Sequence, residues 1–372
     1  MLLTQFRWIT GCVSGGCLEG DIAKKGWWRT QGGEPVVVTY DSSLPENADD
    51  DDIRSAFGLG CDGVVEVMLE RAGAPGRIDP LEFASACTQA QRRGALVTVI
   101  HSRVPTIKLG TRVAVQVDGD PIADDIADDV LRTAMIADGR AALASGESCH
   151  RTYSSARGSV DVFVEAILPP PRLFVFGTGH DAVPVVQAAK QLGWDVAVCA
   201  EQVRVTTRQR FSGADEVLVG SPAELAARVD ECDRAVAIVM AHSYATDRAN
   251  LGMLLATNAR YIGVLGPRTR TTRMLDELGA SAHADSRLHA PIGLEIGAET
   301  PQEIALAILS EVQSVLRRVP ARSLRDLAGP IHERPMPRIA QEIDAVTMPS
   351  ARELEPHAPA SREMPAVVPL VS

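Results

Sequence analysis

The sequence predicts an α/β protein: a C-terminal Rossmann-like parallel sheet with helices on both faces, plus a smaller N-terminal α+β domain. Hydrophobic residues make up 45% of the chain but aromatic residues only 4%, a composition that favours buried strands of valine, alanine, leucine and isoleucine. A β-α-β rhythm begins after Pro171. The apolar run Leu173–Phe176 leads directly into a glycine turn, Gly177-x-Gly179-x-x-Ala182, which is typical of a strand–turn–helix that passes close to a bound phosphate.

The length of 372 residues favours two domains. We assign residues 1–168 to the N-terminal domain, 169–171 to a proline linker, 172–320 to the Rossmann-like domain and 321–372 to a tail. Seven prolines between Pro335 and Pro369, without apolar periodicity, predict that this tail is disordered.

In the N-terminal half, short strands alternate with glycine loops and helices. Met1–Ile9 is interpreted as the remainder of a strand, followed by the glycine loop Gly11–Gly20. Strands are predicted at Val36–Tyr40, Val64–Leu69, Ala95–His101, Thr111–Val117 and Val160–Leu168, and helices at Leu18–Lys25, Pro80–Arg93 and Ile122–Leu143. The acidic run Asp49–Asp52 is interpreted as a solvated loop.

The C-terminal half repeats strand and helix in turn. After Leu173–Phe176, strands are predicted at Val196–Cys199, Glu216–Val219, Ala235–Met240 and Tyr261–Leu265. Helices are predicted at Asp181–Leu192, Pro222–Val229 and Asp247–Ala256, and from Arg268 to about Leu278. A last helix begins at Thr300-Pro301-Gln302-Glu303, which is a capping-box sequence with proline at the first helical position.

Charge and composition exclude several classes of function. The net charge of −11 argues against general attraction to nucleic acid or to an anionic membrane. No apolar run approaches the roughly 20 residues that span a bilayer, and the N-terminus lacks the pattern of a signal peptide, so we expect a cytoplasmic protein. Seven scattered cysteines do not suggest a disulfide framework.

Polar residues follow the strands of the predicted Rossmann-like sheet. His180, His242, Asp247 and Arg268 come after three of its strands, and His289 and Gly293 lie in a further strand-end loop. Ligands of such sheets bind at the carboxyl ends of the strands, so these residues are candidate ligand contacts together with Gly177 and Gly179. Arg268 lies in the turn itself and is the preferred anion ligand, whereas Arg270 and Arg273 are interpreted as a solvated face.

The same turn makes NAD(P) a weaker candidate as ligand. A dinucleotide domain needs an acid at the end of its second strand to bind the ribose hydroxyls. That place is occupied by Ala200, and Glu201 comes one residue late.

Two cysteines differ from the others because each lies in a glycine loop. Cys17 follows Gly15 and Gly16, and Cys61 follows Gly60. Loop amides favour the thiolate, which is the form that binds a metal, although two thiols without a nearby histidine do not make a zinc site. The other cysteines in ordinary contexts, Cys87, Cys149, Cys199 and Cys232, are predicted to be small buried hydrophobes.

Taken together, these motifs resemble the XdhC/CoxI family, accessory proteins of molybdenum hydroxylases such as xanthine dehydrogenase. The resemblance covers about residues 10 to 318. It rests on Val13-Ser14-Gly15-Gly16-Cys17 with Glu19-Gly20, Gly58-Leu59-Gly60-Cys61, Pro169–Leu173 into Gly177-Thr178-Gly179-His180, Tyr261–Gly266, and His289–Gly293 through Ile296–Pro301.

The resemblance implies a chaperone and not an enzyme. Members bind the molybdenum cofactor (molybdopterin) as cargo, protect it, assist its sulfuration and insert it into the apo-hydroxylase. A cysteine desulfurase is an implied partner, and members tend to form homodimers. Cys61 is then the expected contact of the molybdenum, with Cys17 second, and we expect the Gly177 turn to face the Cys61 loop across the linker.

The chain departs from the family pattern at three places. Cys12 replaces a serine, and Ala200 replaces the acid after the second Rossmann strand. The family pattern also has a strand and a loop upstream of what is here Met1, so we expect the first domain to lack its first strand. Without the family resemblance, two alternative functions remain open. One is an NAD(P)-dependent oxidoreductase, which the Gly177 turn supports, and the other is a nucleotide-sensing regulatory module.

Overall fold

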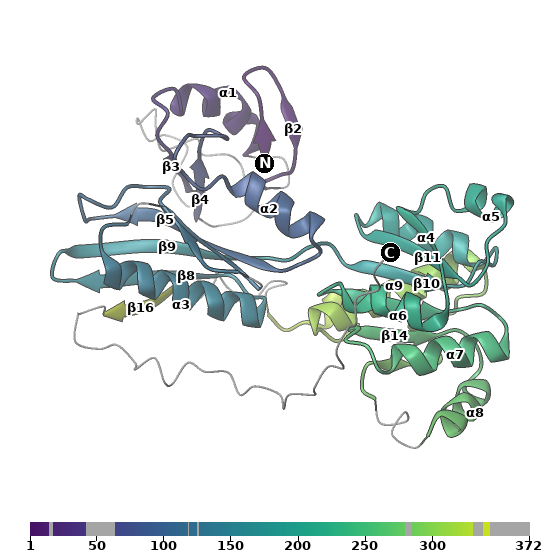
Figure 1. The fold of residues 1–372 in the computed structure, drawn as a ribbon. Helices are drawn as coiled ribbons and strands as arrows, with labels where there is room; N and C mark the ends of the chain where they lie inside the picture. Colours follow the sequence, from purple (N-terminus) through teal and green to yellow (C-terminus); the bar gives the residue numbers. More distant parts are fainter. Residues whose placement is uncertain are drawn as a thin grey trace, which may run out of the picture.

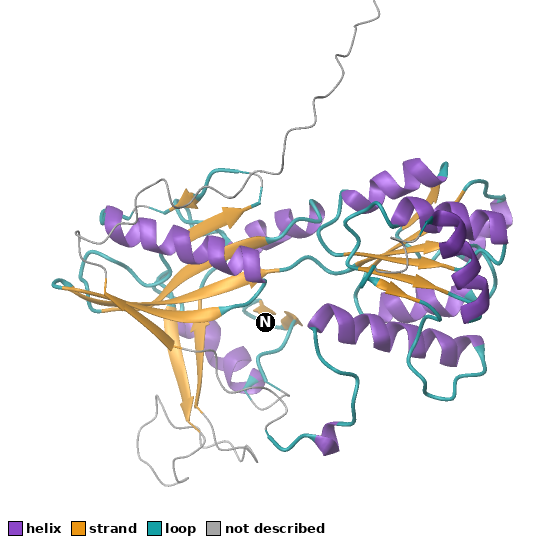
Figure 2. Cartoon of the chain, turned by 90° about the horizontal axis from the view of Figure 1, so that it is seen from below, coloured by secondary structure: helices purple, strands orange, loops and turns teal. Residues whose placement is uncertain are grey.

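The computed structural model describes residues 1–14, 18–41, 64–117, 119–124, 126–279, 285–329 and 338–342. Two lobes lie side by side, joined by the linker that leads into strand β10 (Figure 1). The C-terminal lobe holds a parallel sheet between helices, and the N-terminal lobe holds antiparallel strands with fewer helices (Figure 2). The predicted α/β class, with a Rossmann-like sheet and a smaller N-terminal domain, is therefore confirmed.

The C-terminal sheet has six parallel strands in the order β12-β11-β10-β13-β14-β15. Their bounds are β10 Arg172–Phe176, β11 Asp195–Ala200, β12 Glu216–Val219, β13 Ala235–Val239, β14 Tyr261–Val264 and β15 Leu288–His289. The chain winds outward in one direction from β10 to β12 and then returns to the other side of β10 with β13. This reversal places a topological switch point between β10 and β13.

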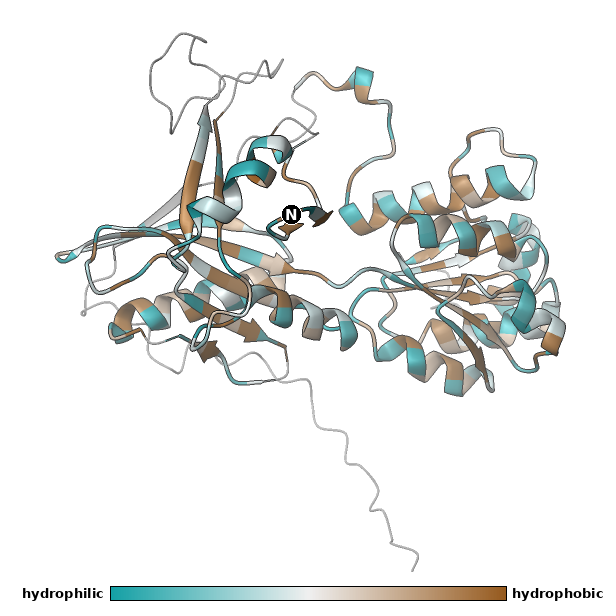
Figure 3. Cartoon of the chain, turned by 90° about the horizontal axis from the view of Figure 1, so that it is seen from above, coloured by the Kyte–Doolittle hydropathy of each residue, from teal (hydrophilic) through white to brown (hydrophobic). Residues whose placement is uncertain are grey.

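Helices cover both faces of this sheet because β10 is apolar on both. Leu173 and Val175 pack with α4 (Ala182–Gln191) and α9 (Pro301–Arg317). Phe174 and Phe176 point to the opposite face. That face is covered by α6 (Pro222–Asp230), α7 (Tyr244–Leu254) and α8 (Arg268–Leu278). In Figure 3 the strands of this lobe are mainly hydrophobic, whereas its helices alternate, as expected for amphipathic helices on a buried sheet.

The N-terminal sheet has the order β16-β8-β9-β5-β6-β7, antiparallel except for the parallel pair β16–β8. Its strands are β5 Gly94–Ser102, β6 Arg112–Gln116, β7 Ile122–Ala123, β8 Cys149–Ser155, β9 Gly158–Ile167 and β16 Arg338–Glu342. One face is apolar and packs on α3 (Asp129–Ser145), while α2 (Pro80–Gln89) covers part of the other face.

A smaller unit stands against this second face (Figure 1). It contains the hairpin of β3 (Val36–Asp41) and β4 (Val64–Leu69), the pair β1 (Leu2–Leu3) and β2 (Trp8–Thr10), and helix α1 (Glu19–Arg29). Its core is formed by Leu18, Ile22, Val38, Tyr40 and Val67.

The structure differs from the sequence prediction at several of the described elements. Met1–Ile9, interpreted as one strand, contains β1 and most of β2. Strand β8 and helix α5 (Val205–Arg210) were not predicted, because both segments are largely polar. The helix expected from Ile122 begins instead at Asp129, where the Asp128 side chain accepts hydrogen bonds from the first-turn amides. Within the tail predicted to be disordered, residues 338–342 form β16 on the edge of the N-terminal sheet. This strand pairs with β8, which is distant in the sequence, so the residues near 338–342 do not predict it.

No helix in the described ranges is long and apolar enough to cross a membrane.

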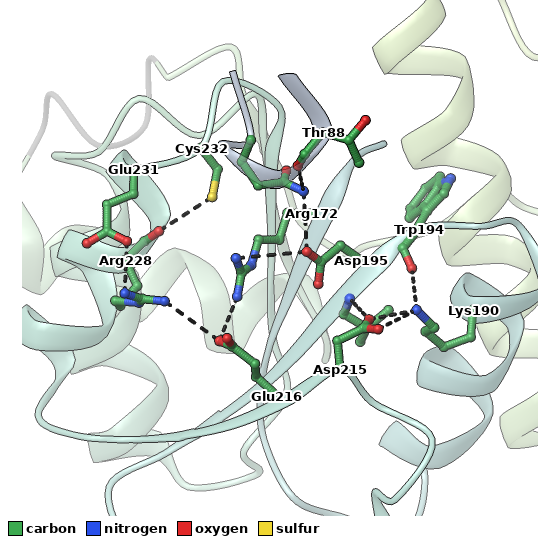
Figure 4. A network of polar contacts seen from close by, with 12 residues as sticks. Thr88, Arg172, Lys190, Trp194, Asp195, Asp215, Glu216, Arg228, Glu231 and Cys232 are labelled. Atoms are coloured by element: carbon green, nitrogen blue, oxygen red, sulfur yellow. Dashed lines mark hydrogen bonds and ion pairs between the residues drawn. The ribbon is translucent and has the colours of Figure 1, made fainter. Parts of the chain in front are cut away.

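The two domains contact each other at the amino ends of the C-terminal strands. The carboxylate of Asp233 accepts a hydrogen bond from the Arg93 amide at 2.8 Å and lies 3.3 Å from Nη1 of Arg92. The Gln91 side chain donates to Asp195, which shares the Arg172 guanidinium with Glu216 (Figure 4). The Gly177 turn lies away from this junction, at the carboxyl end of β10, and the Cys61 loop that it is expected to face lies outside the described residues.

We predict that Asp233→Ala loosens this junction. Removing the carboxylate leaves the Arg93 amide without its acceptor and removes one ionic contact of Arg92. This should speed tryptic cleavage after Arg92 and Arg93 about fivefold, the factor that corresponds to about 1 kcal/mol. Asp326→Ala, in an exposed 3-10 turn, is the matched control. Equal cleavage of the two variants would contradict a docking role for Asp233.

Candidate functional site

The candidate site is the carboxyl edge of the parallel sheet at the switch point. The turn Gly177–Asp181 follows β10, and residues Ala241–Ser243 follow the neighbouring strand β13. The amide of Met240 donates to Phe176 O at 2.9 Å, so the two turns leave the sheet side by side. In doubly wound folds this crevice is where ligands bind.

Close approach of backbone requires glycine at 177, whereas at 179 the nearest atom belongs to a side chain that can turn away. A Cβ atom at Gly177 would lie 2.4 Å from the carbonyl oxygen of Met240, and one at Gly179 would lie 2.3 Å from Oδ1 of Asp181. The first contact fixes the turn against β13. The second shows that the Asp181 carboxylate folds back over the turn.

Asp181 also pairs with His242, whose backbone has a positive φ of 60°. His242 Nε2 lies 2.7 Å from Asp181 Oδ2, and the imidazole is largely exposed. Asp181 occupies the N-cap position of α4 but accepts no capping hydrogen bond there. The pair therefore places a carboxylate and an imidazole, two groups that can hold or pass a proton, where a helix N-terminus would otherwise attract an anion.

Asp247 lies behind this edge and is satisfied within the protein. It is 1% exposed, accepts from the Ala241 amide at 2.9 Å and pairs with Arg270 Nη2 at 2.6 Å. Arg270 was expected on a solvated face, yet its guanidinium is drawn inward by this buried carboxylate. Arg268 is exposed at the first residue of α8, and its side chain has no hydrogen bond or ion pair with the described residues, so it is the open cation of this edge.

His289 and Gly293 belong to a separate cluster further along the edge. The His289 ring stacks on Tyr261 at 4.4 Å, and its Nδ1 lies 3.4 Å from Oε1 of Glu311. The other oxygen of Glu311 accepts from the Tyr261 hydroxyl and from the Gly293 amide. Burial and this carboxylate raise the pKa of the Tyr261 phenol. The cluster fixes α9 to β14 and β15.

His180 is exposed at the tip of the turn. Arg210 of α5, which sequence reasoning missed, donates to the carbonyl oxygen of Thr178 at 2.9 Å and holds the turn from the side. The structure thus brings together Gly177, Gly179 and His242, adds Asp181 and Arg210, and keeps His289 and Gly293 apart. Asp181 could have been found from the sequence, since it ends the same glycine motif, whereas nothing near Arg210 marks it.

The predicted thiol loops fall outside the described residues. Gly15, Gly16, Cys17, Gly60 and Cys61 all lie there. Within the described ranges no group of three or more His, Cys, Asp or Glu side chains is arranged to hold a metal ion, and Cys12 is exposed with a free thiol.

The described end of the first loop is held by Glu19. Its carboxylate accepts hydrogen bonds from the amides of Val13 and Ser14 at 2.8 and 2.6 Å, and from the Ser14 hydroxyl. The side chain is 2% exposed. These donors, led by the Ser14 amide, lower the pKa of Glu19 to about 2.

Comparisons with known proteins show which family and which relatives this chain resembles. Residues 173–312 match the family model described as the XdhC Rossmann domain. A Bacillus subtilis protein whose name describes it as a probable component of xanthine dehydrogenase is 27% identical over 309 residues, which is 83% of this chain and 85% of that protein. "Uncharacterized protein YqeB" of Escherichia coli is 33% identical over 171 residues, 45% of this chain and 31% of that protein.

One solved structure supports the same fold. It is described as a xanthine dehydrogenase from Bacillus halodurans and superposes with a TM-score of 0.61 at 24% identity, covering 86% of this chain and 85% of that one. The resemblance inferred from the motifs is confirmed by these matches.

We predict that Asp247→Ala destabilises the C-terminal domain by about 3 kcal/mol, because it leaves the Arg270 guanidinium and the Ala241 amide without their shared carboxylate. Urea unfolding followed by the fluorescence of Trp194, which is buried in this domain, measures the loss. Glu295→Ala, at an exposed position, should change stability little. A difference below about 0.5 kcal/mol between the two variants would show that the pair is not a structural anchor.

We also predict an acid-sensitive first loop. Because the folded pKa of Glu19 is lowered to about 2 from 4.5, its stabilising effect is complete above about pH 4.5 and is lost as the pH falls toward 2. Glu19→Gln should remove this effect at all pH values. Hydrogen exchange at neutral pH, read on a peptide containing Val13 and Ser14, should then be faster in the variant, and unchanged exchange would contradict the anchoring role.

Proposed function

We propose that the protein has an accessory role in the maturation of a xanthine dehydrogenase-type molybdenum hydroxylase, because residues 173–312 match the family model described as the XdhC Rossmann domain. In this role it binds the molybdenum cofactor as cargo, protects it, assists its sulfuration and inserts it into the apo-hydroxylase. The observation that carries the proposal is the match over residues 173–312, which coincides with the domain that bears the open switch-point edge.

The edge supplies contacts for an anionic group of the cargo. Arg268 is exposed and free to bind a phosphate. The Gly177 turn lets a ligand approach the backbone closely. Nε2 of His242 lies 2.7 Å from Oδ2 of Asp181, and an incoming phosphate needs the Asp181 carboxylate to turn away. The imidazole, once freed, can donate to the phosphate.

The thiol loops are proposed to serve the metal end of the cargo. Cys61 is the proposed molybdenum contact and Cys17 the second candidate. The thiol loops and the carboxyl edge of the sheet are proposed to contact different ends of one cargo molecule. The protein is proposed to act as a homodimer. The desulfurase is proposed to deliver sulfur at the same thiol loops.

An oxidoreductase that uses NAD(P) is the second candidate. The strand order and the glycine turn favour a nucleotide. Two features oppose it: Ala200 ends β11 without an acid, and Asp181 places a negative charge at the N-terminus of α4. Calorimetry with NADH and NADPH separates the two functions, since turnover of a carbonyl substrate would favour the oxidoreductase.

We predict that protein purified from cells that make molybdenum cofactor carries a pterin, which is released on denaturation and detected by its fluorescence after oxidation. Cys61→Ala should lower the retained pterin about tenfold or more, as loss of a metal contact does. Cys149→Ala, a half-buried thiol on β8, should retain it.

Absence of pterin in the wild-type protein would contradict the proposed cargo. Equal retention by Cys61→Ala would contradict the choice of thiol only.

A further inference from the structure

A cavity of about 650 Å³ lies in the N-terminal domain, away from the sheet edge described above. It lies between the β3–β4 hairpin and the face of the N-terminal sheet opposite α3, where the hairpin stands over β5 and β9 in Figure 1. Its volume is within the range of small-molecule sites. The residues that matter for its chemistry are Thr98, Arg112, Phe163 and Glu165.

The two faces of this sheet differ sharply in polarity. On β9, Val160, Val162 and Val164 are buried against α3. The alternate residues, Phe163 and Glu165, line the cavity. A sheet face that is roofed by protein normally carries apolar side chains, because buried charge costs free energy unless it is paired. Arg112 on this face is buried and paired with Glu70, whereas Glu165 is exposed, so the cavity offers both a guanidinium and an accessible carboxylate to a ligand.

Strand register sets the positions of the polar groups. Thr98 of β5 lies opposite both Phe163 and Arg112, so these three residues form one row across the sheet. Glu165 lies two residues along β9 from Phe163 and opposite Leu96. The backbones of Arg112 and Phe163 are thus two strand spacings apart, about 10 Å, and Glu165 is the next residue on the same face of β9 after Phe163.

Both charged groups have unused hydrogen-bonding capacity. Arg112 is 2% exposed and binds Glu70 and the Ile78 carbonyl, but its Nε has no hydrogen-bond partner in the described part of the chain. Glu165 makes no hydrogen bond with a described residue. It is reached by solvent from within the cavity, and the surrounding protein raises its pKa against the opposing charge of Arg112.

We propose that this cavity binds a planar heterocycle with a 2-amino-4-oxopyrimidine edge, the chemistry shared by guanine and pterin. The Glu165 carboxylate accepts hydrogen bonds from the ring N–H and the adjacent amino group, as carboxylates do from paired donors. Arg112 donates to the oxo group on the other side, and the Phe163 ring contacts the ring face. The pterin form of this ligand rests on the proposed function, whereas the guanine form does not.

The test is binding of three probes to the full-length protein: neopterin, guanosine, and adenosine, which lacks the edge. Neopterin is followed by its own fluorescence and the nucleosides by calorimetry. We expect neopterin or guanosine to bind and adenosine not to bind. Binding of only one of the first two identifies the source of the edge. Binding of neither, or equal binding of adenosine, overturns the proposal.

Two variants locate the site. Glu165→Gln keeps the shape but places an amide donor against the ligand donors, which should weaken binding about tenfold. Glu82→Gln, on the exposed side of α2, is its matched control and should bind normally. Phe163→Leu should weaken binding about threefold, because the aromatic contact is lost. Unchanged affinity in Glu165→Gln overturns the proposal, and if that variant does not fold, unchanged affinity in Phe163→Leu does so.

The outcomes are separate from those of the cargo experiment. Guanosine binding that depends on Glu165, in a protein that carries no pterin, supports the cavity and contradicts the cargo. Pterin retained equally by the wild type and a folded Glu165→Gln supports the cargo and contradicts the cavity.

Discussion

The central constraint of the structure is the position of β10, which is hydrogen-bonded to parallel strands on both sides and buried on both faces. A strand in that position must be apolar throughout, and its side chains must alternate between two helical layers. It also ends where the winding of the sheet reverses. The Gly177 turn therefore has no room for a side chain, because the carbonyl of Met240 from the next strand already occupies it.

The two ends of β10 are surrounded by different groups of residues. At its amino end, Arg172, Asp195 and Glu216 form a charged network, and the neighbouring Asp233 holds the N-terminal domain. At its carboxyl end, His242 and Asp181 meet in the open crevice. The domain junction and the candidate ligand edge are thus kept apart by the length of the strand.

Sequence reasoning worked where a single element carries its own signal. The apolar run before Gly177, the capping box at Thr300 and the strand-end position of His242 were all readable locally. Sequence reasoning failed where the position of a side chain or strand depends on residues that are distant in the sequence. Nothing beside Arg270 shows that the buried Asp247 will attract it in place of Arg268, and β8 is polar because half of its side chains face a cavity formed by other strands.

The claim that most needs a direct measurement is that ligand binds at the carboxyl edge between β10 and β13. Hydrogen exchange, compared with and without the molybdenum cofactor, addresses this edge through peptides covering residues 177–182 and 240–247. Our account predicts slower exchange in both peptides when the cofactor is bound, because its phosphate approaches the turn amides. Cofactor binding that leaves both peptides unchanged would contradict it.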